Sequence, residues 1–155
     1  MRDPVYNSTT SINKYFELQL KPALEEVYGS SICIYFEDQQ KQLFPNITIL
    51  HPNTGDKDTK SFSYLNEIVF HLNVTKAQDN KARKMIDRFY SFTGLNLQNV
   101  SNFVVLPVYD YDVNPIQQVG CMRLYIDSGF FRMPESDPMI RHYKADLRIQ
   151  YQSRF

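Results

Sequence analysis

Residues 45–74 read PNITILHPNTGDKDTKSFSYLNEIVFHLNV, and they contain two strand-like runs with a polar tract between them. The first run covers residues 45–51. The second covers residues 62–74, and apolar side chains recur at every second position of its later half, at Ile68, Phe70, Leu72 and Val74. This alternation is typical of a strand that buries one face. Because Pro, Asn, Gly, Thr and charged residues fill positions 52–60, the tract between the runs predicts a long hairpin loop.

Two other stretches have the residue spacing of amphipathic helices. The first follows three capping residues at positions 9–11 and ends at Gly29; its apolar face consists of Ile12, Phe16, Leu20, Leu24 and Val27. Pro22 interrupts this helix, so we expect a kink or a break near residues 20–21. The second helix is predicted over residues 79–93, before Gly94, with an apolar stripe made of Ala82, Met85, Ile86, Phe89, Tyr90 and Phe92.

Four more runs predict strands, at residues 31–37, 103–110, 118–127 and 142–151. Pro107 lies within one of them, which favours either an edge strand or a change of pairing partner there. Strands outnumber helices, and the helices are separated in the sequence. The predicted fold class is therefore α+β, with a mixed, mainly antiparallel sheet that has a long hairpin and is packed by two amphipathic helices. We also predict an N-terminal arm at residues 1–9, a single domain over residues 10–155 and an exposed loop at residues 128–140.

The composition of the 155-residue chain fits one folded domain, because 43% of its residues are hydrophobic and domains of this size bury a substantial core. Its 17 basic and 17 acidic residues cancel. Proteins dedicated to DNA or RNA binding usually carry a basic excess, since phosphate contacts supply much of their affinity. No run approaches the ~18 apolar residues of a membrane span, and no apolar run follows the first residue to indicate a secretory signal.

The two cysteines, Cys33 and Cys121, fit no zinc-binding spacing. The favoured interpretation is a pair of reduced core thiols, because free cysteine packs as a small apolar group. A disulfide between them stays open as the alternative.

Catalytic signatures are absent from the sequence. No nucleophile–base arrangement and no glycine-rich phosphate loop is recognisable. His51 and His71 lie on strands predicted to pair, where they could bind a metal together, but two polar residues on a solvent face are favoured. Asp110, Asp112 and Asp127 lie near strand ends, where carboxylates can hold magnesium as in nucleases; solvated turn acids are favoured. The chain is therefore predicted to be no enzyme and to need no metal or other cofactor.

Two features favour contacts with other proteins. The hairpin tract carries four charged residues, Asp56, Lys57, Asp58 and Lys60. A hairpin that extends beyond its domain can add strands to a neighbour's sheet, so this tract is the predicted oligomer or tube contact. The predicted loop at 128–140 carries three large apolar residues, Phe130, Phe131 and Met133. Exposed apolar residues cluster where partners dock, so these form the predicted partner contact. A mobile loop for the first, and a lid folded onto the core for the second, are the alternatives.

Five features follow one another along the chain. They are the helix ending at Val27-Tyr28-Gly29, the strand SICIYFE (31–37), the hairpin at 45–74, the helix KARKMIDRFYSF (81–92) and the strand HYKADLRIQYQ (142–152). This order resembles that of the tail-terminator (tail-completion) proteins of long-tailed phages. The resemblance covers residues 10–152 and is one of architecture, without a signature motif.

The resemblance implies a structural component of the virion that is assembled in the host cytoplasm. Such a protein forms a hexameric ring on the last ring of the tail tube, stops tube growth and joins the tube to neck proteins, while DNA only passes through its channel. A head-completion or neck adaptor protein is one alternative. The others are a metal-dependent nucleic-acid-processing enzyme that uses the aspartates, and a small regulatory or adaptor module.

Overall fold

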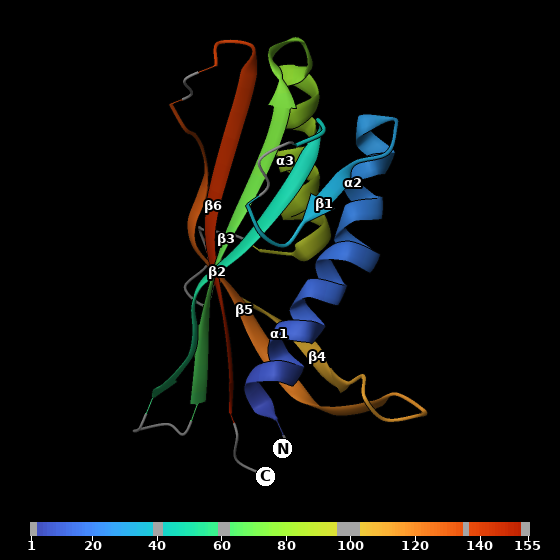
Figure 1. Cartoon of the computed structure of the whole chain (residues 1–155), viewed down its shortest axis with the longest axis vertical. Coiled ribbons are helices and arrows are strands. Elements are labelled where there is room, and N and C mark those ends of the chain that lie inside the picture. Colours follow the sequence, from blue (N-terminus) through green and yellow to red (C-terminus); the bar gives the residue numbers. More distant parts are fainter. Residues whose placement is uncertain (1–2, 39–41, 59–62, 96–102, 135–136, 153–155) are drawn as a thin grey trace.

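The computed structural model describes residues 3–38, 42–58, 63–95, 103–134 and 137–152. Within these residues, six strands form one sheet of order β1-β2-β3-β6-β5-β4. The strands are β1 (Cys33–Tyr35), β2 (Asn46–Asp58), β3 (Ser63–Thr75), β4 (Phe103–Asp110), β5 (Gln117–Arg132) and β6 (Ile140–Gln152). Strand β1 pairs with β2 in parallel, and the other neighbouring pairs are antiparallel. The sheet curls like a half-barrel (Figure 1), and the predicted α+β class with a mainly antiparallel sheet is confirmed.

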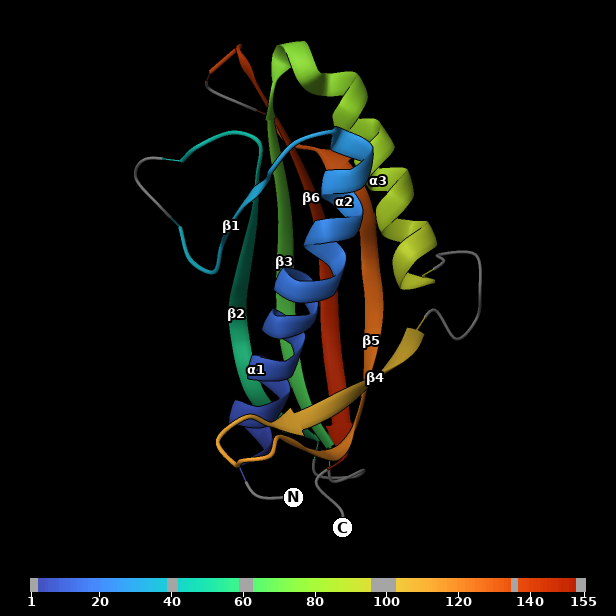
Figure 2. The same cartoon turned by 90° about the vertical axis from the view of Figure 1, so that its right-hand side faces the viewer.

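Helices cover the inner face of the curled sheet (Figure 2). Helix α1 (Pro4–Tyr15) continues through a π-helical turn, η1 (Phe16–Leu20), into α2 (Lys21–Tyr28), and the short 3-10 turn η2 (Lys76–Gln78) leads into α3 (Asp79–Thr93). The predicted helix at 79–93 is confirmed, and it ends at Gly94, whose φ of 79° favours glycine. None of the helices in the described ranges is long and apolar enough to cross a lipid bilayer.

Pro22 gives a physical reason for the π-helical turn. Proline has no N–H, and in a regular α-helix its ring would collide with the carbonyl of the residue four positions earlier, Leu18. In the wider turn the Lys21 N–H donates to the carbonyl of Phe16, five residues earlier, so the chain accommodates the proline without breaking. The predicted break near residues 20–21 is thus a change of helix type. The predicted apolar face is confirmed for its fully buried members, Ile12, Phe16, Leu20 and Leu24.

The N-terminal arm predicted over residues 1–9 is wrong from Pro4 onward, because α1 begins there. Proline suits the first turn of a helix, where its missing N–H would have had no partner. The segment lacks apolar periodicity because two of its buried residues, Asn7 and Ser8, are polar. A pattern of apolar residues could not reveal a helix that buries polar side chains.

The core lies between the helices and the sheet, and an aromatic cluster forms its centre. Phe70 of β3 is fully buried. Its ring centroid lies 5.5 Å from that of Phe16, 5.1 Å from that of Phe89 and 5.7 Å from that of Phe130. These rings come from the π-helical turn, α3 and β5, so one side chain of the sheet joins three other elements.

The hairpin of β2 and β3 is longer than predicted, because β2 runs through the polar tract to Asp58. The pairing with β3 shifts register between Leu50 and Asn53, and again between Asn53 and Asp56. Gly55 has a φ of 85°, and its N–H donates to Asn66 Oδ1 of β3 at 2.6 Å. The turn-forming residues therefore lie at irregularities within a strand and do not end it.

Strands β1 and β4 form the two edges of the sheet. Strand β4 has the predicted bounds of residues 103–110 and lies at an edge, as Pro107 indicated. Strand β1 is shorter than the predicted run at 31–37, because only Cys33–Tyr35 pair with β2, opposite residues 46–48. Beyond Thr48, no described strand pairs with the outer side of β2.

Candidate functional site

The sheet face turned away from the helices is polar where β2, β3 and β6 lie side by side, and we call it the polar face. The core residues Ile47, Phe70 and Leu72 alternate with polar neighbours, which places those neighbours on the opposite face. The strand register aligns two cross-strand rows, one of Asn46, Asn73 and His142 and one of Thr48, His71 and Lys144. Side chains opposite each other in such rows are close enough to interact.

A buried amide network forms the floor of the polar face. Asn46 is 0% exposed, and its Oδ1 accepts hydrogen bonds from Asn73 Nδ2 at 2.8 Å and from Thr48 Oγ1 at 3.2 Å. Its Nδ2 donates to the Leu43 carbonyl at 2.9 Å and to Gln42 Oε1 at 3.3 Å. The polar atoms of this side chain are therefore all paired, and the network holds the β1–β2 connection against the sheet.

Two histidines face each other across β3 and β6 on the polar face. His71 Nδ1 and His142 Nε2 lie within hydrogen-bonding distance, and the ring centroids are 4.6 Å apart. A cavity of about 290 Å³ opens beside the two rings and is bordered by Asp38, Phe44 and Asp137 among others. The pair thus lies at the wall of a small hollow whose rim is acidic.

Both histidines are held in the neutral form. Burial lowers the pKa of His71 to about 4, and the charge of His142 acts in the same direction, whereas Asp38 opposes it. Burial also lowers the pKa of His142, helped by Lys144 and opposed by Asp38. Near neutral pH the two imidazoles are therefore uncharged, and one ring can donate a hydrogen bond to the other.

Because burial lowers the pKa of both His71 and His142, we predict that acid destabilises the folded protein. An unfolded histidine has a pKa of about 6.5, whereas folding lowers the pKa of His71 to about 4. The unfolded chain binds the proton more tightly, so the stability that this difference contributes is fully present above about pH 6.5 and is lost as the pH falls toward 4. We expect the free energy of unfolding to drop by about 1–2 kcal/mol between pH 7 and pH 5, with allowance for partial exposure of the ring.

Urea unfolding of the wild type and of His71→Gln at both pH values measures this loss. The variant should lose less stability than the wild type between pH 7 and pH 5, and the two proteins should show the same pH dependence between pH 7 and pH 8. Equal losses between pH 7 and pH 5 would contradict the assignment to His71.

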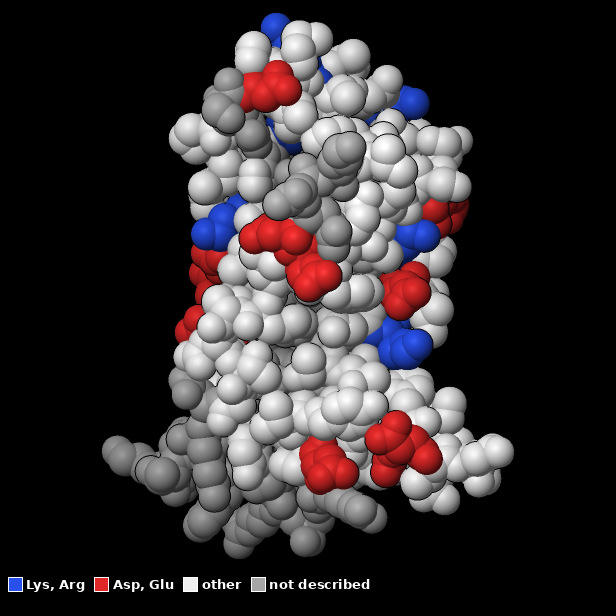
Figure 3. Space-filling view, in the orientation of Figure 1, with Lys and Arg blue, Asp and Glu red and all other residues white. Residues whose placement is uncertain are grey.

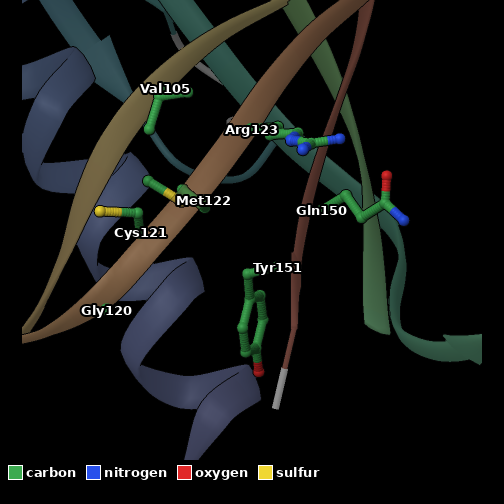
Figure 4. Close-up of a pocket in the computed structure, with 7 residues that line it drawn as sticks. All are labelled: Val105, Gly120, Cys121, Met122, Arg123, Gln150 and Tyr151. Carbon is green, nitrogen blue, oxygen red and sulfur yellow. The ribbon is translucent and has the colours of Figure 1, made fainter. Parts of the chain in front are cut away.

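A second hollow, of about 410 Å³, lies where β5 and β6 diverge (Figure 4). The described pairing of these strands begins at Arg123 and Gln150, whereas Cys121 pairs with β4. Val105 of β4 borders the hollow and is 59% exposed. The hollow combines the exposed apolar side chain of Val105 with the guanidinium of Arg123.

The two cysteines, Cys33 and Cys121, are both free. The predicted core position is wrong for Cys121, which is exposed.

The predicted partner contact is only partly at the surface. Strand β5 extends to Arg132, so the loop predicted at 128–140 is wrong for residues 128–132. Phe130 packs against the core, as the lid alternative stated, and its N–H donates to Tyr90 Oη at 3.1 Å. Phe131 is 41% exposed, with Lys144 Nζ 5.8 Å from its ring centroid. Met133 is half-buried, and its N–H donates to the His142 carbonyl at 2.8 Å.

The predicted oligomer contact lies at the other end of the molecule. Asp56, Lys57 and Asp58 belong to the last part of β2, and Lys60 lies outside the described residues. In Figure 1 this end of the β2–β3 hairpin is at the bottom, whereas the end of β5 is at the top beside the start of β6. The structure therefore separates the two predicted contacts along the long axis.

The acidic residues considered for magnesium are not brought together. Asp127 accepts hydrogen bonds from Arg148 Nε at 2.9 and 3.1 Å, while Asp110 Oδ1 accepts one from the Asp112 N–H at 3.0 Å in the β4–β5 turn. Within the described part of the chain, no group of three or more His, Cys, Asp or Glu side chains could hold a metal ion.

The histidine pair considered from the sequence is also wrong. His71 lies opposite Thr48 on β2, and His51 Nε2 instead lies 2.8 Å from Asn13 Oδ1 of α1. The true partner of His71, His142, is 71 residues away in the chain. Polar residues alternate with apolar ones in both strands, but only knowledge that β3 pairs with β6 could have joined the two histidines.

A comparison with models of known protein families gives no match for this chain, and a comparison with curated protein sequences gives none either. The functional conclusion therefore depends on the residues and the fold described above.

Proposed function

We propose that this protein is a structural component of a phage virion, a tail terminator (tail-completion protein) that forms a ring at the end of the tail tube and joins the tube to the neck. The order of helices and strands resembles that of tail terminators, and the open edges of the sheet provide a structural argument for ring formation. Its role is assembly through protein contacts, without catalysis.

The observation that carries the proposal is that the sheet has two unlike open edges. One edge is β4, and the other is the outer side of β2 beyond Thr48, where no described strand pairs. Unlike edges favour a head-to-tail contact, in which one edge of a copy meets the other edge of the next copy. Repeated contacts of this kind close into a ring when the rotation between copies allows it.

Two further features support the proposal. The predicted contact regions lie at opposite ends of the long axis (Figure 1), as a protein between a tube and a neck requires. The chain has a formal net charge of zero, and on the face seen in Figure 3 the acidic and basic side chains of the described residues are interspersed, without a basic patch. DNA could pass such a surface without being held by it.

A charge on the β4 edge should prevent the ring from forming. Val105 is 59% exposed, so Val105→Lys should leave the fold intact. Charged residues on edge strands oppose pairing with another chain, and we expect association to weaken by at least about tenfold, the effect of ~1.4 kcal/mol. Native mass spectrometry and electron microscopy, with and without purified tail tubes, measure the assembly.

Asn80→Lys is the matched control, because it adds the same charge at an exposed position of α3, a helix that packs against α2 and β3. It should assemble like the wild type. A wild-type protein that stays monomeric even with tail tubes would contradict the proposed function, whereas a ring that survives Val105→Lys would contradict the role of β4.

A further inference from the structure

We propose that His71 and His142 form a binding site for one divalent transition-metal ion of the zinc, nickel or copper type. This inference goes beyond the proposed function and does not depend on it. It follows from the placement of the two imidazoles, from their chemistry and from the charge around them.

The backbone positions the two imidazoles for a shared ligand. They project from the same face of β3 and β6, which are paired without interruption from Ser63↔Gln152 to Thr75↔Ile140. Both strands are interior strands of the sheet. His71 Nδ1 and His142 Nε2 point at each other, so a change of tautomer in the ring that donates the hydrogen bond would turn both lone pairs toward a common position. Ligands held on rigid strands keep their geometry better than ligands on loops.

The chemistry of the pair fits such an ion. Histidine binds a metal through a neutral ring nitrogen, and burial keeps both rings neutral near pH 7. Two nitrogens that each lie ~2.0–2.1 Å from a tetrahedral zinc ion are separated by roughly 3.3 Å. The two nitrogens lie closer than this in the structure, so the rings would have to move apart to admit the ion. Both imidazoles then carry their protons on the nitrogens that face away from the ion, His71 on Nε2 and His142 on Nδ1, so no net proton is released.

The surroundings favour a cation over an anion. Asp38 and Asp137 border the cavity of about 290 Å³ beside the rings, and Asp38 acts electrostatically on both histidines. Lys144 acts in the opposite direction on both histidines, but its charge is partly offset by Asp146, with Nζ 3.6 Å from Oδ1. Among the described residues, no third His, Cys, Asp or Glu completes a cluster with the pair.

The test uses the full chain without a polyhistidine tag, after treatment with a chelator. Calorimetric titration with Zn²⁺ and with Ni²⁺ should show one ion bound per chain, and thermal melting should shift upward with added metal. His71→Gln and His142→Gln should each weaken binding at least tenfold and abolish the shift. His51→Gln is the matched control, because His51 lies beside Asn13 and not at this site; it should bind like the wild type.

Melting of each variant without metal shows whether it is folded. If a glutamine variant is unfolded, Cu²⁺ electron paramagnetic resonance of the wild type decides, since two histidine ligands produce hyperfine coupling to two nitrogens. Absence of binding by the wild type would overturn the proposal and leave a simple hydrogen bond between the rings. Binding that persists in a folded His71→Gln variant, or a copper spectrum without coupling to two nitrogens, would overturn it as well.

Discussion

Replacing Phe70 by alanine should lower the free energy of unfolding by about 3–5 kcal/mol, the usual cost of removing a buried aromatic ring. Phe70 is 0% exposed, and its ring meets those of Phe16, Phe89 and Phe130. These partners are fixed by three different elements, so the surrounding structure cannot collapse easily into the cavity. Stability losses of this size lower the melting temperature by roughly 6–20 °C in a protein of this length.

Phe92→Ala is the control for this change. Phe92 is 39% exposed and lies on α3 at the margin of the core, with its ring 6.2 Å from that of Tyr15. Its removal should cost less than about 1.5 kcal/mol, since much of the ring is already in water. Urea unfolding of both variants gives the comparison. Equal losses in the two variants would show that the aromatic cluster is not the centre of the core.

Replacing Asn46 by alanine should cost about 2–4 kcal/mol, although the side chain carries no charge and does little to fill the core. Its Oδ1 is the acceptor for Asn73 Nδ2 and for Thr48 Oγ1, and both donors are buried. Each buried donor left without a partner costs about 1–3 kcal/mol. The change also releases the Leu43 carbonyl, so amide hydrogen exchange should become faster in the β1–β2 connection.

A double-mutant cycle with Asn73→Ala separates the network from a simple loss of packing. Asn46→Ala/Asn73→Ala removes one of the unpaired donors, so the double variant should lose less stability than the sum of the single variants. Asn80→Ala, at an exposed position of α3, is the matched control and should not reduce stability. A loss below about 0.5 kcal/mol for Asn46→Ala would place it among ordinary surface changes and would contradict the network.

The sequence predicted the elements that depend on local spacing. Helix α3 and strand β4 have the predicted bounds; one apolar periodicity that ends before Gly94 defines the helix, and the strand is a short apolar run that ends at Asp110. The N-terminal helix was predicted along its apolar face but missed at its beginning, where Asn7 and Ser8 are buried and polar. Strand β2 was cut short in the prediction, because Gly55 usually marks a turn and here lies at an irregularity stabilised by Asn66.

The candidate site could not be predicted in the same way. His71 and His142 come together only because β3 pairs with β6, and sequence spacing does not specify pairing between strands so far apart. The contact predicted for Phe130 fails for a related reason. Alternation along β5 assigns Phe130 and Phe131 to opposite faces, but the Gly and Pro residues around them suggested a loop, in which no such assignment holds.

The π-helical turn connects the proline at position 22 with the number of residues in the N-terminal helices. Without this turn, either one could change without affecting the other. Each residue turns an α-helix by about 100°, so an inserted residue normally rotates one half of a helix away from its contacts. Here the turn absorbs one such residue, and Ile12 and Leu24 both stay buried. A chain one residue shorter, lacking the exposed Leu18, could form an uninterrupted α-helix with the same buried face only if position 22 were no longer proline.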